Sequence, residues 1–184
     1  MRLLLFGGLT ALLAWVSRGP LGAPGSHGFY RFFAWEGMLA LLLLNFGGVG
    51  RWFADPLSLR QVVSWVLLFG SLVPASLGAL ELRRRGAVRR DRHDPSLFAF
   101  EKTTRLVTTG VYGSIRHPLY ASLVLLTLGV FWKRPSWIAV ALAAAASGLL
   151  VATAIVEERE NLRFFGEEYR AYRLATRMFI PRLI

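Results

Sequence analysis

The polar residues best suited to chemistry lie at 106–120, directly before a hydrophobic segment. This stretch reads Leu-Val-Thr-Thr-Gly-Val-Tyr-Gly-Ser-Ile-Arg-His-Pro-Leu-Tyr. Arg116 and His117 are costly to hold at a membrane boundary unless they bind something. Because Pro118 suits the first turn of a helix, free backbone N–H groups should point from that turn toward the loop. Together with the parallel donors of Arg116, they could bind an anionic group such as a ligand carboxylate.

Two tyrosines in the same stretch, Tyr112 and Tyr120, offer flat faces to a heteroaromatic ring or to a cation. The alternative for the whole cluster is a topological role. In that case Arg116 would be a positive-inside anchor, and the tyrosines would belong to an interfacial aromatic belt. A ligand site is favoured because all of these groups gather at one boundary.

A second polar cluster, at 157–161, follows the next two hydrophobic segments. Its adjacent acids, Glu157 and Glu158, end a hydrophobic segment, where negative charge opposes the helix dipole. They are a poor choice for stability alone and could receive an amino group, a ribose hydroxyl or a sulfonium. The alternative is an interfacial helix end that is paired with arginines such as Arg116 or Arg163. Two such clusters on either side of a helical hairpin are expected to form the two walls of one site.

The composition is that of a membrane protein. Of the 184 residues, 54% are hydrophobic and 18% are charged, and the apolar residues occur in blocks. The basic residues behind the net charge of +11 cluster between those blocks, which favours membrane topology and anionic lipid over nucleic acid. The chain has no cysteine, and its three histidines share no metal-ligand spacing, so disulfides, thiolate chemistry and a metal site are not expected.

Five hydrophobic segments should position the two clusters. They are Leu3–Val16, Phe32–Val49, Val62–Leu82, Leu119–Phe131 and Trp137–Val156. A spanning helix needs about 20 residues, so the first and fourth segments are short. The expected fold is all-α, an integral membrane bundle of about five transmembrane helices in a single domain, 1–184. The fourth and fifth segments form a tight hairpin, with or without a full crossing, and Lys133 in their connector is expected to reach toward water.

Basic residues set the expected orientation. The loop 83–105 carries eight arginines and lysines against three acids, which predicts a cytoplasmic location in a bacterial-type inner or plasma membrane. Two further passes return the chain to that side, so the tail and the active site should face the cytoplasm. The tail at 157–178 reads as an amphipathic helix interrupted at Gly166, able to lie on the membrane and cap a site. His27 and His93 lie in polar segments and are expected to be solvated.

The motifs at 106–120 and 157–172 together resemble the isoprenylcysteine carboxyl methyltransferase family and, more loosely, the related phospholipid N-methyltransferases. The second motif reads Glu-Glu-Arg-Glu-Asn-Leu-Arg-Phe-Phe-Gly-Glu-Glu-Tyr-Arg-Ala-Tyr. The similarity covers about residues 80–184, the expected catalytic part, and the first two segments add only generic hydrophobicity. The resemblance implies an integral membrane enzyme that transfers a methyl group from S-adenosylmethionine, releases S-adenosylhomocysteine and takes a lipophilic or amphiphilic acceptor from the membrane.

The resemblance also implies roles for individual residues. A cytosolic cofactor pocket would be closed by the C-terminal segment and lined by Val107, Gly110, Tyr112, His117, Pro118, Tyr120, Glu157 and Glu158. Arg116 matches an arginine expected near the reacting groups, and with Glu158 it is the expected catalytic pair. Where family tails usually carry arginine and proline, this chain has Ala175 and Arg177. That departure concerns the acceptor pocket more than the cofactor pocket, and Arg173 or Arg177 could substitute.

The acceptor would be a carboxylate, an amine or a thiol. Methyl transfer is an in-line displacement that needs positioning and charge management, and for a carboxylate or thiolate it needs no strong base. Two other classes stay open: a membrane reductase that uses a nicotinamide cofactor, since some sterol reductases share a similar helical arrangement, and a non-catalytic membrane protein that has kept the fold.

Overall fold

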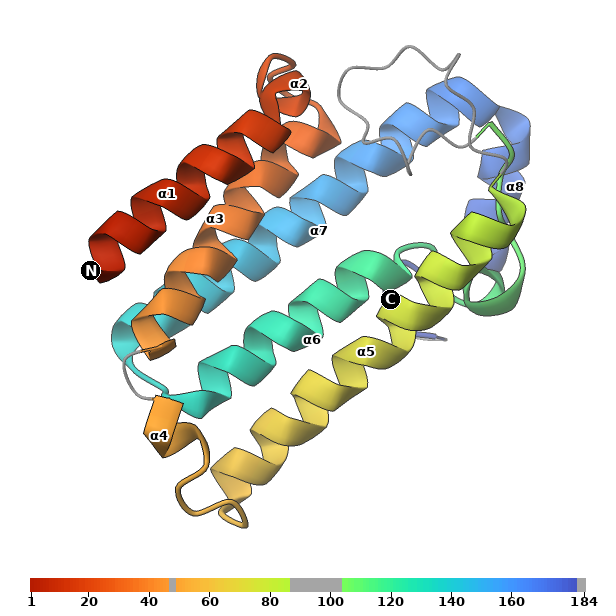
Figure 1. The fold of residues 1–184 in the computed structure, drawn as a ribbon. Coiled ribbons are helices and arrows are strands. Elements are labelled where there is room, and N and C mark those ends of the chain that lie inside the picture. Colours follow the sequence, from red (N-terminus) through yellow and green to blue (C-terminus); the bar gives the residue numbers. More distant parts are fainter. Residues whose placement is uncertain (47–48, 87–103, 182–184) are drawn as a thin grey trace.

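The computed structural model describes residues 1–46, 49–86 and 104–181 of the chain. In this part the secondary structure is helical apart from one isolated β-bridge, which confirms the all-α prediction. The centre of the basic loop, with His93, lies outside the described residues. The long helices lie side by side, and α6 runs between α5 and α7 (Figure 1).

Five helices coincide with the five hydrophobic segments. They are α1 (Arg2–Val16), α3 (His27–Phe46), α5 (Leu59–Arg85), α6 (Pro118–Lys133) and α7 (Trp137–Phe165). In the described part of the chain, three of them, α3, α5 and α7, are long and apolar enough to cross a membrane. The other two, α1 and α6, have 15 and 16 residues and are shorter than a usual span, so fewer helices qualify as spans than the five predicted. The remaining helices are short: α2 (Arg18–Leu21), α4 (Val49–Trp52), a 3-10 turn (Gly110–Gly113) and α8 (Glu167–Ala175).

Small residues let the helices approach closely. A Cβ atom added at Gly129 of α6 would lie 2.8 Å from the side chain of Leu68 on α5. One added at Gly37 of α3 would lie 3.3 Å from the Cβ of Ala146 on α7. At these positions no side chain separates the two helices, and such close approach through small residues is typical of helix packing in lipid. The α5–α6 and α3–α7 pairs are thereby fixed, and the ends of these four helices frame the candidate site.

Lys133 does not reach toward water, contrary to the sequence-based expectation. Its side chain is 1% exposed, at the end of α6 that lies away from Pro118. The Nζ atom donates to Oε1 of Gln61 at 2.9 Å and lies 3.3 Å from the ring centre of Trp65. An amide oxygen and an aromatic face thus take the place of water around the ammonium. Because both partners lie on α5, the buried lysine fastens α6 to that helix.

The C-terminal part of the chain is also divided differently from the prediction. Residues 157–165, expected to begin a separate amphipathic helix, are the last turns of α7. The break falls at Gly166 as predicted, where a φ of +59° favours glycine over other residues. Beyond it, α8 turns two aromatic side chains, Tyr169 and Tyr172, toward the protein interior, and both are buried. The tail therefore packs on the bundle rather than lying free as a surface helix.

Candidate functional site

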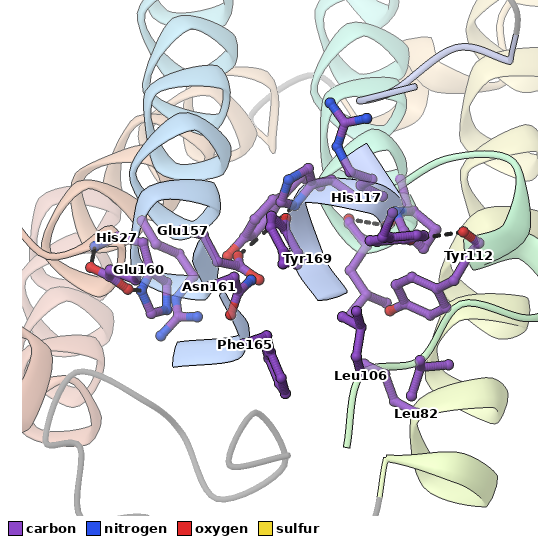
Figure 2. A pocket seen from close by; sticks show the side chains of 18 of the residues that line it. His27, Leu82, Leu106, Tyr112, His117, Glu157, Glu160, Asn161, Phe165 and Tyr169 are labelled. Carbon is purple, nitrogen blue, oxygen red and sulfur yellow. Dashed lines mark hydrogen bonds and ion pairs between the residues drawn. The ribbon is translucent and has the colours of Figure 1, made fainter. Parts of the chain in front are cut away.

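A cavity of about 250 Å³ lies where α3 and α6 begin and where α5 and α7 end (Figure 2). Both polar clusters of the sequence contribute to its wall. Of the nine residues expected at the site, seven line it, namely Val107, Tyr112, Arg116, His117, Pro118, Tyr120 and Glu157. The other two, Gly110 and Glu158, lie outside the lining and support it from behind. The structure thus brings together two segments that are far apart in the sequence.

Gly110 allows the loop to lie directly on α5. Its φ of +60° is a conformation that side chains disfavour, and an added Cβ would lie 2.5 Å from Oε1 of Glu81. The neighbouring hydroxyl of Thr109 donates to Oε2 of the same glutamate at 3.3 Å. Only glycine satisfies both the backbone angle and the close approach. The role of Gly110 in this structure is to shape the loop that carries the cavity-lining residues.

His117 lies at the centre of the site. It is the N-cap of α6, which begins at Pro118 as predicted, and its side chain is 3% exposed. Its ring stacks on Tyr120 with the ring centres 5.5 Å apart. Its Nδ1 lies 4.0 Å from Oε2 of Glu157, and its Nε2 lies 3.4 Å from Oε1 of Glu158. The imidazole therefore faces both acids, and the Tyr120 side chain hydrogen-bonds to Glu157.

Glu158 is buried in a network of basic side chains. Its Oε1 accepts from Nε of Arg116 at 2.6 Å, and its Oε2 lies 3.3 Å from Nε of Arg173. Glu158 is thus paired with arginines, which the sequence had left as an alternative. Arg116 is 9% exposed at its side chain, and its Nη1 also donates to the carbonyl oxygen of Thr176 at 2.6 Å. Two of its three guanidinium nitrogens therefore donate within the chain, so Arg116 is better placed to position the site than to clamp a ligand with a full fork.

The C-terminal tail closes this side of the site. The N–H of His117 donates to the carbonyl oxygen of Met178 at 3.1 Å, next to a parallel bridge between Ile115 and Arg177. The buried hydroxyl of Tyr172 donates to the carbonyl oxygen of Tyr112 at 2.7 Å. Burial raises the pKa of the Tyr172 phenol further above neutral, so the hydroxyl stays a donor even at alkaline pH. The tail, the loop and α7 therefore form one connected wall.

The wall formed by α3 was missed at the level of sequence. His27 was expected to be solvated, but it is 1% exposed because its backbone N–H donates to Oε1 of Glu160 at 3.1 Å and its Nδ1 lies 2.5 Å from Oε2. Arg31, one turn further, lines the cavity at 2% exposure with its guanidinium carbon 5.2 Å from the ring centre of Trp35. His27, Arg31 and Trp35 are spaced four residues apart and therefore lie on one face of α3. That polar face at the start of a hydrophobic segment was the signal available in the sequence.

The cavity has two chemically different ends (Figure 2). His27, Glu157, Glu160 and Asn161 gather on the side of α3 and α7. Leu82, Leu106 and Tyr112 lie on the opposite side, with Phe165 and Tyr169 between. Such a cavity suits a ligand that carries charge at one end and a flat apolar group at the other.

Comparisons of the chain with protein-family models, with curated proteins and with solved structures return no match. Among the described residues, no group of three or more His, Cys, Asp or Glu side chains is arranged to hold a metal ion.

Proposed function

We propose that the protein is an integral membrane methyltransferase that binds S-adenosylmethionine in the cavity between the 106–120 loop and the end of α7. The observation that carries this proposal is the division of the cavity into a charged end and an aromatic, apolar end. S-adenosylmethionine has the same division, with an amino acid at one end, an adenine ring at the other and a sulfonium between them. The resemblance of the two motifs to the isoprenylcysteine carboxyl methyltransferase family supports the same conclusion.

The charged end offers partners for both charges of an amino acid. The carboxylates of Glu157 and Glu160 line the cavity and suit the ammonium group. The guanidinium of Arg31, nearly buried in the same wall, suits the carboxylate. Because His27 contacts Glu160 through both its backbone N–H and its ring, it fixes the position of that acid. The residues present thus fit a zwitterionic group.

The opposite end offers a place for the adenine ring. Val107 and Tyr112 are buried there, and Leu82 and Leu106 complete an apolar wall. A flat heteroaromatic ring gains from contact with an aromatic face and with branched apolar side chains. Phe165, at the end of α7, lies between the two ends of the cavity in Figure 2 and would contact the middle of the ligand.

When bound, S-adenosylmethionine would supply an electrophilic methyl group for the acceptor atom, with sulfur keeping the electron pair of the broken carbon–sulfur bond. The protein's part is to position the cofactor and the acceptor and to compensate charge. Glu157, which lines the cavity, would compensate positive charge on the bound cofactor, and His117, whose Nδ1 lies 4.0 Å from Oε2 of Glu157, would accept the proton if the acceptor is an amine. Arg116 and Glu158 act as positioning residues, because they tie the tail and α7 to the loop.

The membrane setting completes the proposal. Five helices would cross or enter the bilayer, with the shorter α1 and α6 supported by their longer neighbours. Arg83, Arg84 and Arg85 at the end of α5 support a cytoplasmic location for the cavity, by the positive-inside rule. The acceptor, a lipophilic or amphiphilic carboxylate, amine or thiol, would enter from the lipid.

Ligand-dependent thermal stability of the detergent-purified protein tests the proposal. We expect S-adenosylhomocysteine to raise Tm and NADPH to leave it unchanged. Stabilisation by NADPH alone would instead select a reductase, and no shift with either ligand would favour a non-catalytic protein. Incubation of lipid extracts with methyl-labelled S-adenosylmethionine would then identify the acceptor.

A further inference from the structure

A second hollow is lined by residues of α8, the end of α7 and the C-terminal tail, and it is separate from the candidate cofactor cavity except for Arg116, which reaches both. Four arginines line it: Arg116, Arg170, Arg173 and Arg177. No acidic residue is among its lining residues, all of which are described. We refer to this surface as the arginine groove. A concave surface lined by guanidinium groups is suited to an anion.

Part of the positive charge of the groove is balanced from behind. The buried carboxylate of Glu158 lies between Arg116 and Arg173, at 2.6 Å and 3.3 Å from their Nε atoms. Two guanidinium groups therefore share one carboxylate. The side chain of Arg173 remains 44% exposed, so it can still contact a ligand in the groove.

The rest of the charge is weakly balanced. Nε of Arg170 lies 3.5 Å from Oε1 of Glu167, but both side chains are largely exposed, and such pairs contribute little. Within the described residues, the Arg177 side chain makes no ion pair. Its backbone, in contrast, is fixed by the bridge to Ile115. The groove therefore carries more positive than negative charge on an ordered backbone.

An apolar side chain stands among these arginines. Leu174 lines the groove, and it is 81% exposed. It follows Arg170 by four residues on α8, so the two share one helix face. A leucine exposed to this extent beside several arginines is unfavourable in water but suits the interface of a membrane. α8 lies at the end of the bundle where the long helix α7 ends (Figure 1).

We propose that the arginine groove binds an anionic membrane phospholipid, with the phosphate among Arg170, Arg173 and Arg177 and the apolar part against Leu174. Charge complementarity favours a phosphate, and the exposed leucine favours an amphiphile over a free ion. Arg173 also contacts Glu158, and Thr176 of the groove accepts from Arg116, so a lipid bound here braces the wall that closes the cavity. The contacts proposed for this lipid do not depend on methyl transfer, so the inference stands without the proposed function.

Binding of short-chain lipids to the purified full-length protein tests this site. The probes are dioctanoyl phosphatidic acid, dioctanoyl phosphatidylcholine and inorganic phosphate, followed by their effect on Tm. We expect the phosphatidic acid to stabilise the protein most. The double variant Arg170→Gln and Arg177→Gln should bind it about thirty-fold more weakly, which corresponds to about 2 kcal/mol. The matched control is Arg83→Gln with Arg84→Gln, two exposed arginines of α5 outside the groove, and it should bind as the wild type does.

Three results would overturn the proposal. Equal loss of binding in the groove variant and in the control would show that only overall charge matters. Equal stabilisation by phosphatidylcholine would show that the apolar contact alone is responsible. Equal stabilisation by inorganic phosphate would reduce the groove to a simple anion site with no preference for a membrane lipid.

Discussion

Replacing Glu158 with alanine should destabilise the protein more than any change of a surface charge. The substitution removes the carboxylate that Arg116 and Arg173 share. Arg116 is 9% exposed, and leaving such a guanidinium without its counter-charge costs about 3–5 kcal/mol. The lower end of this range applies because Nη1 of Arg116 keeps its bond to the carbonyl oxygen of Thr176. Arg173, at 44% exposure, is screened by solvent and adds little.

Thermal unfolding of the detergent-purified protein measures this effect. For a chain of this length, each kcal/mol shifts Tm by about 2–4 °C, so Glu158→Ala should lower Tm by about 6–12 °C. The matched control is Glu167→Ala, whose carboxylate is 84% exposed and lies 3.5 Å from Arg170. It should lower Tm by no more than about 2–4 °C, because exposed pairs contribute at most about 1 kcal/mol.

A double-mutant cycle separates the ion pair from general damage to the packing. Arg116→Ala alone leaves Glu158 buried beside a more distant and more exposed Arg173, so it should also be destabilising. The double variant should be more stable than the sum of the two single effects implies, by about 1–3 kcal/mol. Additive effects, or a Glu158→Ala protein as stable as the Glu167→Ala control, would refute the network described for this site.

Three further predictions follow from the same region. Gly110→Ala should lower Tm, since its positive φ and the nearby carboxylate of α5 impose about 1–3 kcal/mol of strain, whereas Gly148→Ala, with open space around it, should not. Tyr172→Phe should cost about 1–3 kcal/mol in the same assay, because it leaves a buried carbonyl oxygen without its donor. Single cysteines at Arg84 and Ala175, in a chain without its own cysteine, should be labelled from the same side of the membrane, and opposite accessibility would contradict the proposed topology.

The hydrophobic blocks predicted the helices well, because each block must be buried in lipid or against another helix. Pro118 marked the start of α6 correctly, since proline fits only the first turn of a helix without losing a hydrogen bond. The expectation that the two polar clusters would meet was also correct, because the α6–α7 hairpin returns the chain to the end at which it began.

The features that sequence reasoning missed depend on contacts between distant residues. His27 is buried because Glu160, 133 positions later in the chain, satisfies its backbone and its ring. Lys133 is buried because Gln61 and Trp65 of another helix supply an oxygen and an aromatic face. The hydropathy of a segment records none of these partners. For the same reason, the sequence could present the pairing of Glu158 with arginines only as one of two alternatives, the other being contact with a ligand.

Calorimetric titration with S-adenosylhomocysteine tests the central claim most directly. The wild-type protein should bind it, and Glu157→Gln should weaken binding by about ten-fold or more, because a lost hydrogen bond to a charged group is worth about 1.5–3 kcal/mol. Glu167→Gln, a change of the same type at a residue that does not line the cavity, should bind with wild-type affinity. Absence of binding by the wild type, or equal affinity in the Glu157→Gln protein, would contradict the assignment of this cavity to S-adenosylmethionine.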